Sequence, residues 1–93
     1  MKKRELVWTP AVRSKLARFR SERFTPEETL DFIAEFILET EALLSTPALS
    51  KAYTEESGAF AGLSRIVIKK FRVYFEQHEN QVVILAVLFP GEK

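Results

Sequence analysis

Three short runs of β-forming residues in the last third of the chain constrain its fold more than any other feature. Residues 65–69, 71–76 and 82–89 consist mostly of Val, Ile, Phe, Tyr and Leu, and short polar breaks separate them. Such runs at hairpin spacing are typical of antiparallel strands. Turns are expected at Lys69-Lys70 and at residues 77–80, where Asn80 tolerates a left-handed backbone. We therefore predict a three-stranded antiparallel meander.

A short strand that leads directly into a helix is predicted near the N-terminus. Residues 5–8 are β-like, and Thr9-Pro10 has the pattern of an N-cap followed by proline at the first helical position. Three apolar side chains and the stem of one arginine then recur at helical spacing: Val12, Leu16, Phe19 and Arg23. This stripe predicts a helix that continues to residue 23 and has a basic outer face.

A second helix is predicted to begin at Thr25-Pro26-Glu27-Glu28, a capping box in which Thr25 and Glu28 satisfy each other's backbone N–H groups. It is expected over residues 26–45. Its polar face carries four acids, which are expected to pair with the basic first helix: Asp31, Glu35, Glu39 and Glu41. Residues 45–62 are expected to form a loop. The predicted order is β-α-α-β-β-β, an α+β fold with a helical hairpin packed on an antiparallel sheet.

Length and composition exclude several classes of protein. The 93 residues, of which 46% are hydrophobic, suit a single domain over residues 1–93. Because the chain has no cysteine, it has no disulfides, Cys-based zinc sites or thiol catalysis, and we expect a cytoplasmic protein. Polar residues from Glu5 onwards interrupt the N-terminal segment, so no secretion signal is expected. The longest apolar run, residues 82–89, is far shorter than the about 20 residues of a membrane span.

Charge is segregated along the chain. Residues 1–23 hold eight Lys/Arg and two acids, a net charge of +6, whereas residues 24–63 have a net charge of −7 and residues 64–93 one of +2. Such blocks suit a basic face for phosphate or an acidic partner, and equally a solvated helix surface. Arg13 and Arg20 of the first helix are therefore candidates for contacting nucleic acid or a protein, with a solvated face as the alternative.

Three stretches that together span nearly the whole chain resemble the RelE/ParE superfamily, the toxins of bacterial type II toxin–antitoxin pairs. They are LVWTPAVRSKL at residues 6–16, the loop ending in Gly62-Leu63-Ser64-Arg65, and FRVYFEQHENQVVILAVL at residues 71–88. The resemblance implies a growth inhibitor held inactive by a cognate antitoxin in a hetero-oligomer. Some members cleave messenger RNA in the ribosome without a metal, and ParE-like members inhibit DNA gyrase. The expected partners are thus an antitoxin and either gyrase or the translating ribosome, with no membrane and no cofactor.

The end of the last predicted strand bears on the choice between these modes. Nucleases of the superfamily commonly carry a His and an Arg just after it, whereas this chain reads LFPGEK at residues 88–93, with Phe89 in place of the His. The resemblance therefore favours gyrase-type inhibition over RNA cleavage. A non-toxic binding module that kept the scaffold is the third alternative. The run 82–89 is apolar on both faces, which fits a central strand or a side covered by an antitoxin.

Four cations interrupt the predicted sheet and are the main functional candidates: Arg65, Lys69, Lys70 and Arg72. Metal-free RNA cleavage needs a base, an acid and positive charge near the phosphate, and these side chains would supply the charge. Alternation along a strand predicts that Arg65 and Lys69 share one face, where they would bracket a phosphate or an acidic antitoxin segment. The alternative is a wet sheet face, with Lys69-Lys70 simply forming a turn.

An aromatic residue and two acids complete the candidate set. Tyr74 has the parity of Arg72, so Arg65, Arg72 and Tyr74 are the predicted catalytic residues if the chain is a nuclease; a core or interface tyrosine is the alternative. Glu55 and Glu56 are candidate bases, or solvated loop acids.

The single histidine, His78, falls in a predicted hairpin turn and is expected to be exposed. A metal site is not expected, since the chain offers no second His and no Cys to share a metal.

Overall fold

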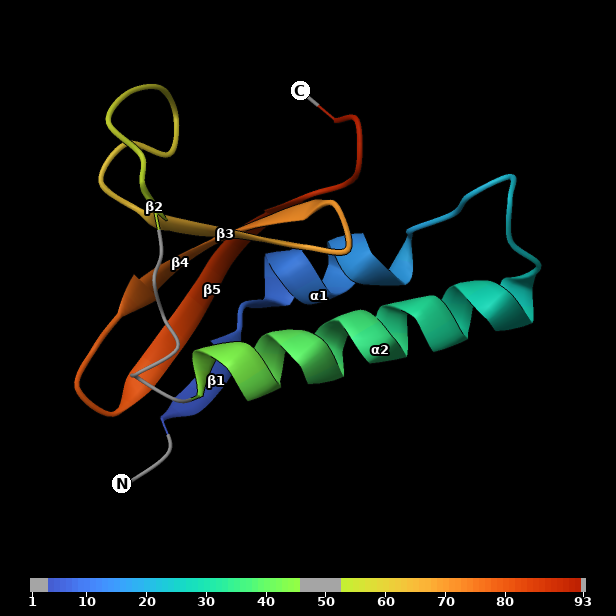
Figure 1. The fold of residues 1–93 in the computed structure, drawn as a ribbon, viewed down its shortest axis with the longest axis horizontal. Coiled ribbons are helices and arrows are strands. Elements are labelled where there is room, and N and C mark those ends of the chain that lie inside the picture. The colour runs from blue at the N-terminus through green and yellow to red at the C-terminus, as the bar shows by residue number, and fades with distance from the viewer. Residues whose placement is uncertain (1–3, 46–52, 93) are drawn as a thin grey trace.

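The computed structural model describes residues 4–45 and 53–92 (Figure 1). The elements are β1 (Glu5–Trp8), α1 (Pro10–Ala17), α2 (Pro26–Leu44), β2 (Tyr53–Thr54), β3 (Ser64–Ile68), β4 (Phe71–Gln77) and β5 (Gln81–Leu88). The predicted α+β class and the order of the predicted elements are confirmed. The two-residue strand β2 is additional, and it lies in the segment that was predicted to be a loop.

The sheet has the strand order β1-β5-β4-β3-β2. The predicted meander of β3, β4 and β5 is antiparallel throughout, but β1 pairs in parallel with β5, so the complete sheet is mixed. No tight turn joins β1 to β5, and therefore no hairpin dictates the direction of β1. The apolar run of β5 lies between β1 and β4, which agrees with the predicted central position.

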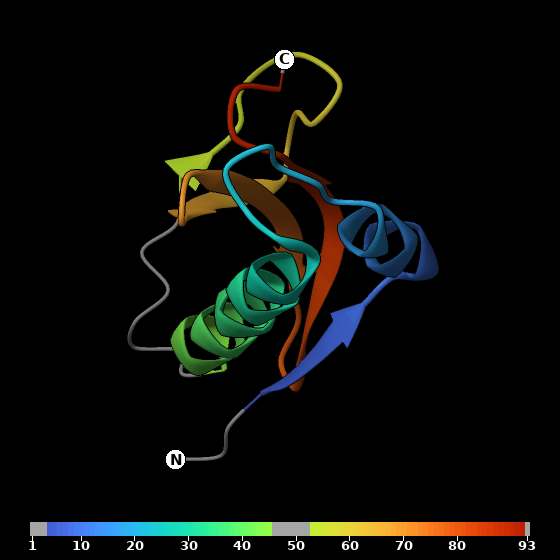
Figure 2. The same ribbon diagram turned by 90° about the vertical axis from the view of Figure 1, so that its right-hand side faces the viewer.

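The core lies between α2 and one face of the sheet, with α1 close to β5 (Figures 1 and 2). Phe71 is fully buried at the start of β4, and its ring lies 4.6 Å from that of Phe36 in α2 and 5.2 Å from that of Phe19. Burial of one such side chain contributes roughly 1.5–3 kcal/mol. This aromatic cluster therefore holds the two helices on the sheet.

The first helix is shorter than predicted. It ends at Ala17, and Arg18 forms its C-cap, although Phe19 continues the apolar stripe and is only 7% exposed. Arg20 donates hydrogen bonds to the carbonyl oxygens of Ala17 and Phe19, at 3.2 and 2.6 Å, and so satisfies acceptors that a longer helix would have used. The prediction of a helix to residue 23 is wrong because Phe19 turns into the core while Arg23 remains outside, in the connection to α2.

The second helix begins as predicted. The Thr25 hydroxyl accepts from the Glu28 N–H at 3.1 Å, and the Glu28 carboxylate accepts from the Thr25 N–H at 2.9 Å. A cap of this kind contributes about 1 kcal/mol. Neither helix within the described ranges combines the length and apolar character that crossing a bilayer requires.

The expected ion pairs between the two helices are absent from the described residues. Glu35 and Glu39 of α2 instead lie 3.4 and 3.8 Å from the Lys69 ammonium, and Glu41 accepts from the Trp8 indole N–H at 3.3 Å. That prediction is wrong because α1 contacts mainly β5, so its cations do not lie along the acidic face of α2.

Candidate functional site

Three predicted site residues meet on the face of the sheet that is turned away from α2. Tyr74 in β4 lies directly opposite Arg65 in β3. Arg72 is two residues before Tyr74, and side chains two apart in a strand share a face. The pairing of β4 with β5 is regular up to the irregularity after Tyr74, so the predicted parity of Arg72 and Tyr74 applies. We call Arg65, Arg72 and Tyr74 the open-face cluster.

Arg65 is held by groups from the segment that precedes β3. Its guanidinium lies 2.9 Å from the Glu55 carboxylate and over the ring of Tyr53, 4.6 Å from the centroid. The Arg65 and Glu55 side chains are 30% and 18% exposed, so the pair is half-buried. Glu55, a predicted candidate base, therefore compensates the charge of Arg65, whereas Glu56 is exposed.

Tyr74 is covered by a closed loop. The loop is joined at its base by hydrogen bonds from the Glu55 N–H to the Leu63 carbonyl and from the Gly62 N–H to the Glu55 carbonyl, at 2.9 and 2.8 Å. Gly62 has a φ of 87°, which side chains with a Cβ rarely adopt. The loop places the Phe60 ring on the ring of Tyr74, 4.2 Å away and nearly parallel. Tyr74 is consequently only 3% exposed.

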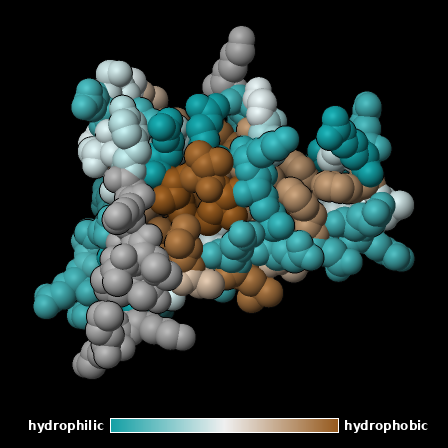
Figure 3. Space-filling model, viewed as in Figure 1, coloured by the Kyte–Doolittle hydropathy of each residue, from teal (hydrophilic) through white to brown (hydrophobic). Residues whose placement is uncertain are grey.

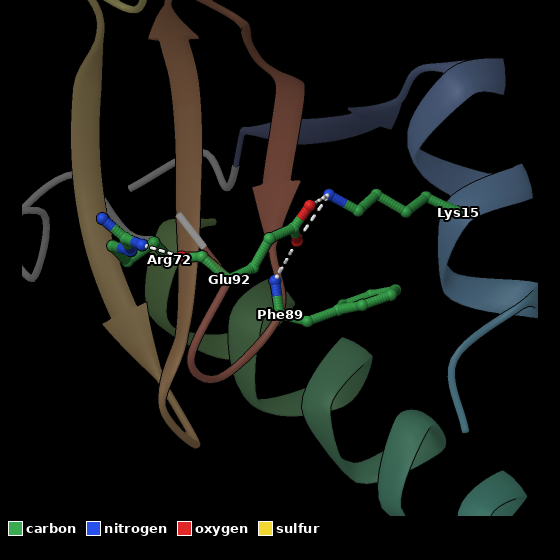
Figure 4. A network of polar contacts seen from close by, with 4 residues as sticks. All are labelled: Lys15, Arg72, Phe89 and Glu92. Atoms are coloured by element: carbon green, nitrogen blue, oxygen red, sulfur yellow. Dashed lines mark hydrogen bonds and ion pairs between the residues drawn. The ribbon is translucent and has the colours of Figure 1, made fainter. Parts of the chain in front are cut away.

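Arg72 is bound by the segment that follows β5 (Figure 4). Its guanidinium donates to the backbone carbonyl of Glu92. The Glu92 carboxylate accepts from the Lys15 ammonium at 2.8 and 2.9 Å and from the Phe89 N–H at 2.8 Å. These hydrogen bonds, that from Lys15 first, lower the pKa of the Glu92 carboxyl. Glu92, in the segment after β5, therefore contacts both β4, through Arg72, and α1, through Lys15.

The two lysines do not join the open-face cluster. The Lys69 ammonium lies near Glu35 and Glu39 and over the ring of Phe32 in α2, on the other side of the sheet from Arg65. The prediction that Arg65 and Lys69 share a face is wrong because β3 ends at Ile68. Lys69 and Lys70 form the turn with φ of 51° and 69°, and strand alternation no longer applies there. Lys70 is exposed.

The other candidates are distributed over the surface. Arg13 is exposed beside a groove between α1 and α2, and Arg20 is exposed just after α1. His78 is exposed in the β4–β5 turn as predicted, and its Nε2 lies 3.5 Å from the Glu76 carboxylate. Residues 4–45 and 53–92 contain no group of three His, Cys, Asp or Glu that could hold a metal ion.

Sequence reasoning missed three residues that surround the open-face cluster. Phe60 had one available signal, since it is a large aromatic residue in a loop of small and polar ones. Tyr53 and Glu92 had none, because their contacts depend on how distant segments meet.

The open-face cluster offers two guanidinium groups of the geometry that binds phosphate or carboxylate, and each is already bound by a group of the chain itself.

The comparisons with known proteins point to one family. Residues 6–89 match the family model described as the ParE toxin of the type II toxin-antitoxin system, parDE. The match extends from β1 through β5 and includes both helices and the open-face cluster. A search of the curated proteins finds no match.

Proposed function

The chain belongs to the ParE toxin family of type II toxin–antitoxin systems, and from this premise we propose that it stops bacterial growth by binding DNA gyrase in the cytoplasm. The family implies a cognate antitoxin as partner. The choice of gyrase over the translating ribosome rests on the residues at the end of β5.

Phe89 is the observation that carries this proposal. It occupies the position where nucleases of the superfamily commonly have a histidine. Its ring packs edge-on against Phe19 at 5.0 Å and against Phe71 at 5.7 Å, so it is a partly buried side chain packed against the core. A phenyl ring cannot transfer a proton, and Tyr74 lies beneath Phe60. Both features support a toxin that acts by binding.

The cations have a role in this binding mode. Arg65 and Arg72 are held by a carboxylate and a carbonyl of their own chain, and acidic groups of a partner would replace these ligands. We assign partner binding to Arg65 and Arg72, with further contacts from the exposed basic residues Arg13, Arg20 and Lys70 and from the partly exposed Lys69.

The antitoxin is proposed to cover the apolar surface between α2 and β3. A shallow groove there is lined by Ala42, Leu43, Val67 and Ile68 and by the paired side chains of Glu39 and Lys69, and Val67 is 61% exposed. Figure 3 shows hydrophobic side chains gathered at the centre of this side of the molecule, with hydrophilic ones around them. Exposed apolar surface of this kind is typical of a protein-binding site.

Induced expression of this chain alone in a bacterial host tests the target. We expect growth arrest, a DNA-damage response and intact transcripts, and we expect the purified chain to inhibit supercoiling by gyrase. Loss of translation with cleaved transcripts would contradict the proposal. Normal growth with abundant folded protein would favour the non-toxic binding module.

One observation favours RNA cleavage as a second candidate. Arg65 and Tyr74 form a direct cross-strand pair, with Arg72 on the same face, so two cations and a phenol are grouped as a metal-free nuclease requires. Phe60 would have to move to expose Tyr74 to a substrate. Incubation of translating ribosomes with the purified chain tests this candidate, and uncleaved messenger RNA would exclude it.

A further inference from the structure

An open pocket is lined by residues of the connection between α1 and α2 and by the two lysines of the β3–β4 turn. Its volume is about 620 Å³, within the usual range of small-molecule sites. Its lining includes four cations and three phenylalanines and no acidic residue. None of the three members of the open-face cluster lines it, so it is a separate site.

The floor of the pocket is aromatic. The ring of Phe32 lies between those of Phe19 and Phe24, with centroid distances of 5.9 and 5.1 Å. Phe19 is buried, whereas Phe24 and Phe32 are only partly buried and line the open space. Partly exposed rings beside cations form the kind of surface on which nucleic-acid bases stack.

The rim of the pocket carries positive charge that the protein itself does not neutralise. Among the described residues, the side chains of Arg23 and Lys70 have no hydrogen-bond or ion-pair partner, and both residues are exposed. The Lys69 ammonium forms ion pairs with the carboxylates of Glu35 and Glu39. Arg20 is oriented by its hydrogen bonds to two backbone carbonyls. Arg23 and Lys70 are therefore the cations available to an anion.

The lysine turn is strained at this pocket. Both of its residues have left-handed φ values, 51° at Lys69 and 69° at Lys70. Two-residue turns with positive φ at both positions favour Asn-Gly, because a Cβ is unfavourable in that conformation. An Asn-Gly turn would relieve the strain but remove both cations from the pocket. Strained backbone of this kind clusters at functional sites, which makes the turn a candidate for one.

We propose that the pocket binds a nucleotide, with its base stacked on Phe24 and Phe32 and its phosphate held by Arg23 and Lys70. A flat ring and an anionic group within one ligand match the aromatic floor and the charged rim together. The nucleotide is either free or a unit of a single strand. This site goes beyond gyrase inhibition and does not depend on it.

Binding to the purified full-length chain tests the proposal. The probes are AMP and ATP, followed by calorimetry, and fluorescein-labelled dT12, followed by anisotropy over a salt series. We expect Arg23→Gln with Lys70→Gln to weaken binding at least tenfold. The log–log salt slope for dT12 should fall by about 0.7, since the two cations hold one phosphate and each neutralised phosphate on a single strand contributes about 0.7. Arg18→Gln removes one positive charge from outside the pocket and should change affinity less than twofold.

Two further variants separate a nucleotide from other anions. Phe24→Leu keeps an apolar side chain but removes the stacking surface, and we expect it to weaken binding about fivefold or more. Lys69→Asn with Lys70→Gly should raise the melting temperature while lowering nucleotide affinity, which a purely structural turn would not do.

Several results would overturn the proposal. The first is the absence of saturable binding of AMP, ATP and dT12 to the folded chain. The second is an equal loss of affinity in the pocket variants and the control variant. The third is full affinity in Phe24→Leu, which would indicate a general anion site or a site for an acidic peptide. Comparable affinity for AMP and dT12 would support a free nucleotide, and binding of dT12 alone would support a strand. None of these assays measures growth inhibition, so a negative result for nucleotide binding does not contradict the toxin proposal.

Discussion

The open-face cluster and the pocket at the lysine turn are both basic and aromatic, yet they differ in what satisfies their charges. Arg65 and Arg72 are bound by Glu55 and by the carbonyl of Glu92, and Phe60 covers Tyr74. Arg23 and Lys70 at the pocket have no such partner among the described residues. A partner of the cluster must therefore displace groups of the protein itself, whereas a ligand of the pocket replaces only water. Composition alone does not distinguish two such sites.

Removal of the aromatic support beneath both regions is expected to have the largest effect. Phe71 is fully buried and contacts Phe19 and Phe32 below the pocket and Phe89 beside the segment that binds Arg72. We expect Phe71→Ala to reduce the free energy of unfolding by about 3–5 kcal/mol because it leaves a cavity. Urea denaturation measures this, with Phe71→Leu as the milder control. A loss below about 1 kcal/mol would show that the two regions do not depend on a common core.

Loss of the open-face guanidinium groups is expected to affect activity far more than stability. Arg65→Ala with Arg72→Ala should reduce growth inhibition or antitoxin affinity at least tenfold, because both charges that a partner would engage are removed. Both side chains are partly exposed, so the free energy of unfolding should change by roughly 1 kcal/mol or less. Growth assays and antitoxin pull-down provide the readouts, and Arg18→Ala, at an exposed arginine outside the cluster, is the control. Unchanged toxicity together with unchanged antitoxin binding would show that the cluster is only structural.

Relief of the strained turn is expected to stabilise the protein. Lys69→Asn with Lys70→Gly should raise the free energy of unfolding by about 1–2 kcal/mol, since left-handed φ is unfavourable for lysine. Lys69→Gln with Lys70→Gln removes the charges but keeps the strain, and it should leave stability within about 0.5 kcal/mol. Chemical denaturation of the two variants compares them directly. Equal stability would mean that the turn stores no strain.

Acidification is expected to release the segment that binds Arg72. The pKa of Glu92 is lower in the folded chain than the ordinary value of a Glu carboxyl, chiefly because of Lys15. The contact therefore contributes stability above that ordinary pKa and loses it as pH falls through the lowered pKa of the folded state. The Phe89 amide resonance should follow this titration in NMR spectra, and Glu92→Gln should remove it. An unshifted Phe89 resonance down to the acid limit would argue against the carboxylate contact.

The local features were predictable from sequence because their causes lie within a few residues. The capping box at Thr25, the apolar runs of β3 to β5 and the shared parity of Arg72 and Tyr74 each depend on neighbours in the chain. The end of α1 was not predictable in this way. Phe19 leaves the helix to meet Phe32 and Phe71, and helical periodicity alone cannot indicate that contact.

The amino-acid sequence by itself thus determined the α+β class, the order of its predicted elements and the likeness to the RelE/ParE toxins. Tertiary structure decided the parallel pairing of β1 with β5, the separation of Lys69 from Arg65, and the contacts of Glu92. Lys15 and Glu92 are 77 positions apart, and no local rule relates them. Helix capping, helical periodicity and strand alternation depend on residues a few positions apart in the chain. A site is completed only where segments that are distant in sequence meet in the folded protein.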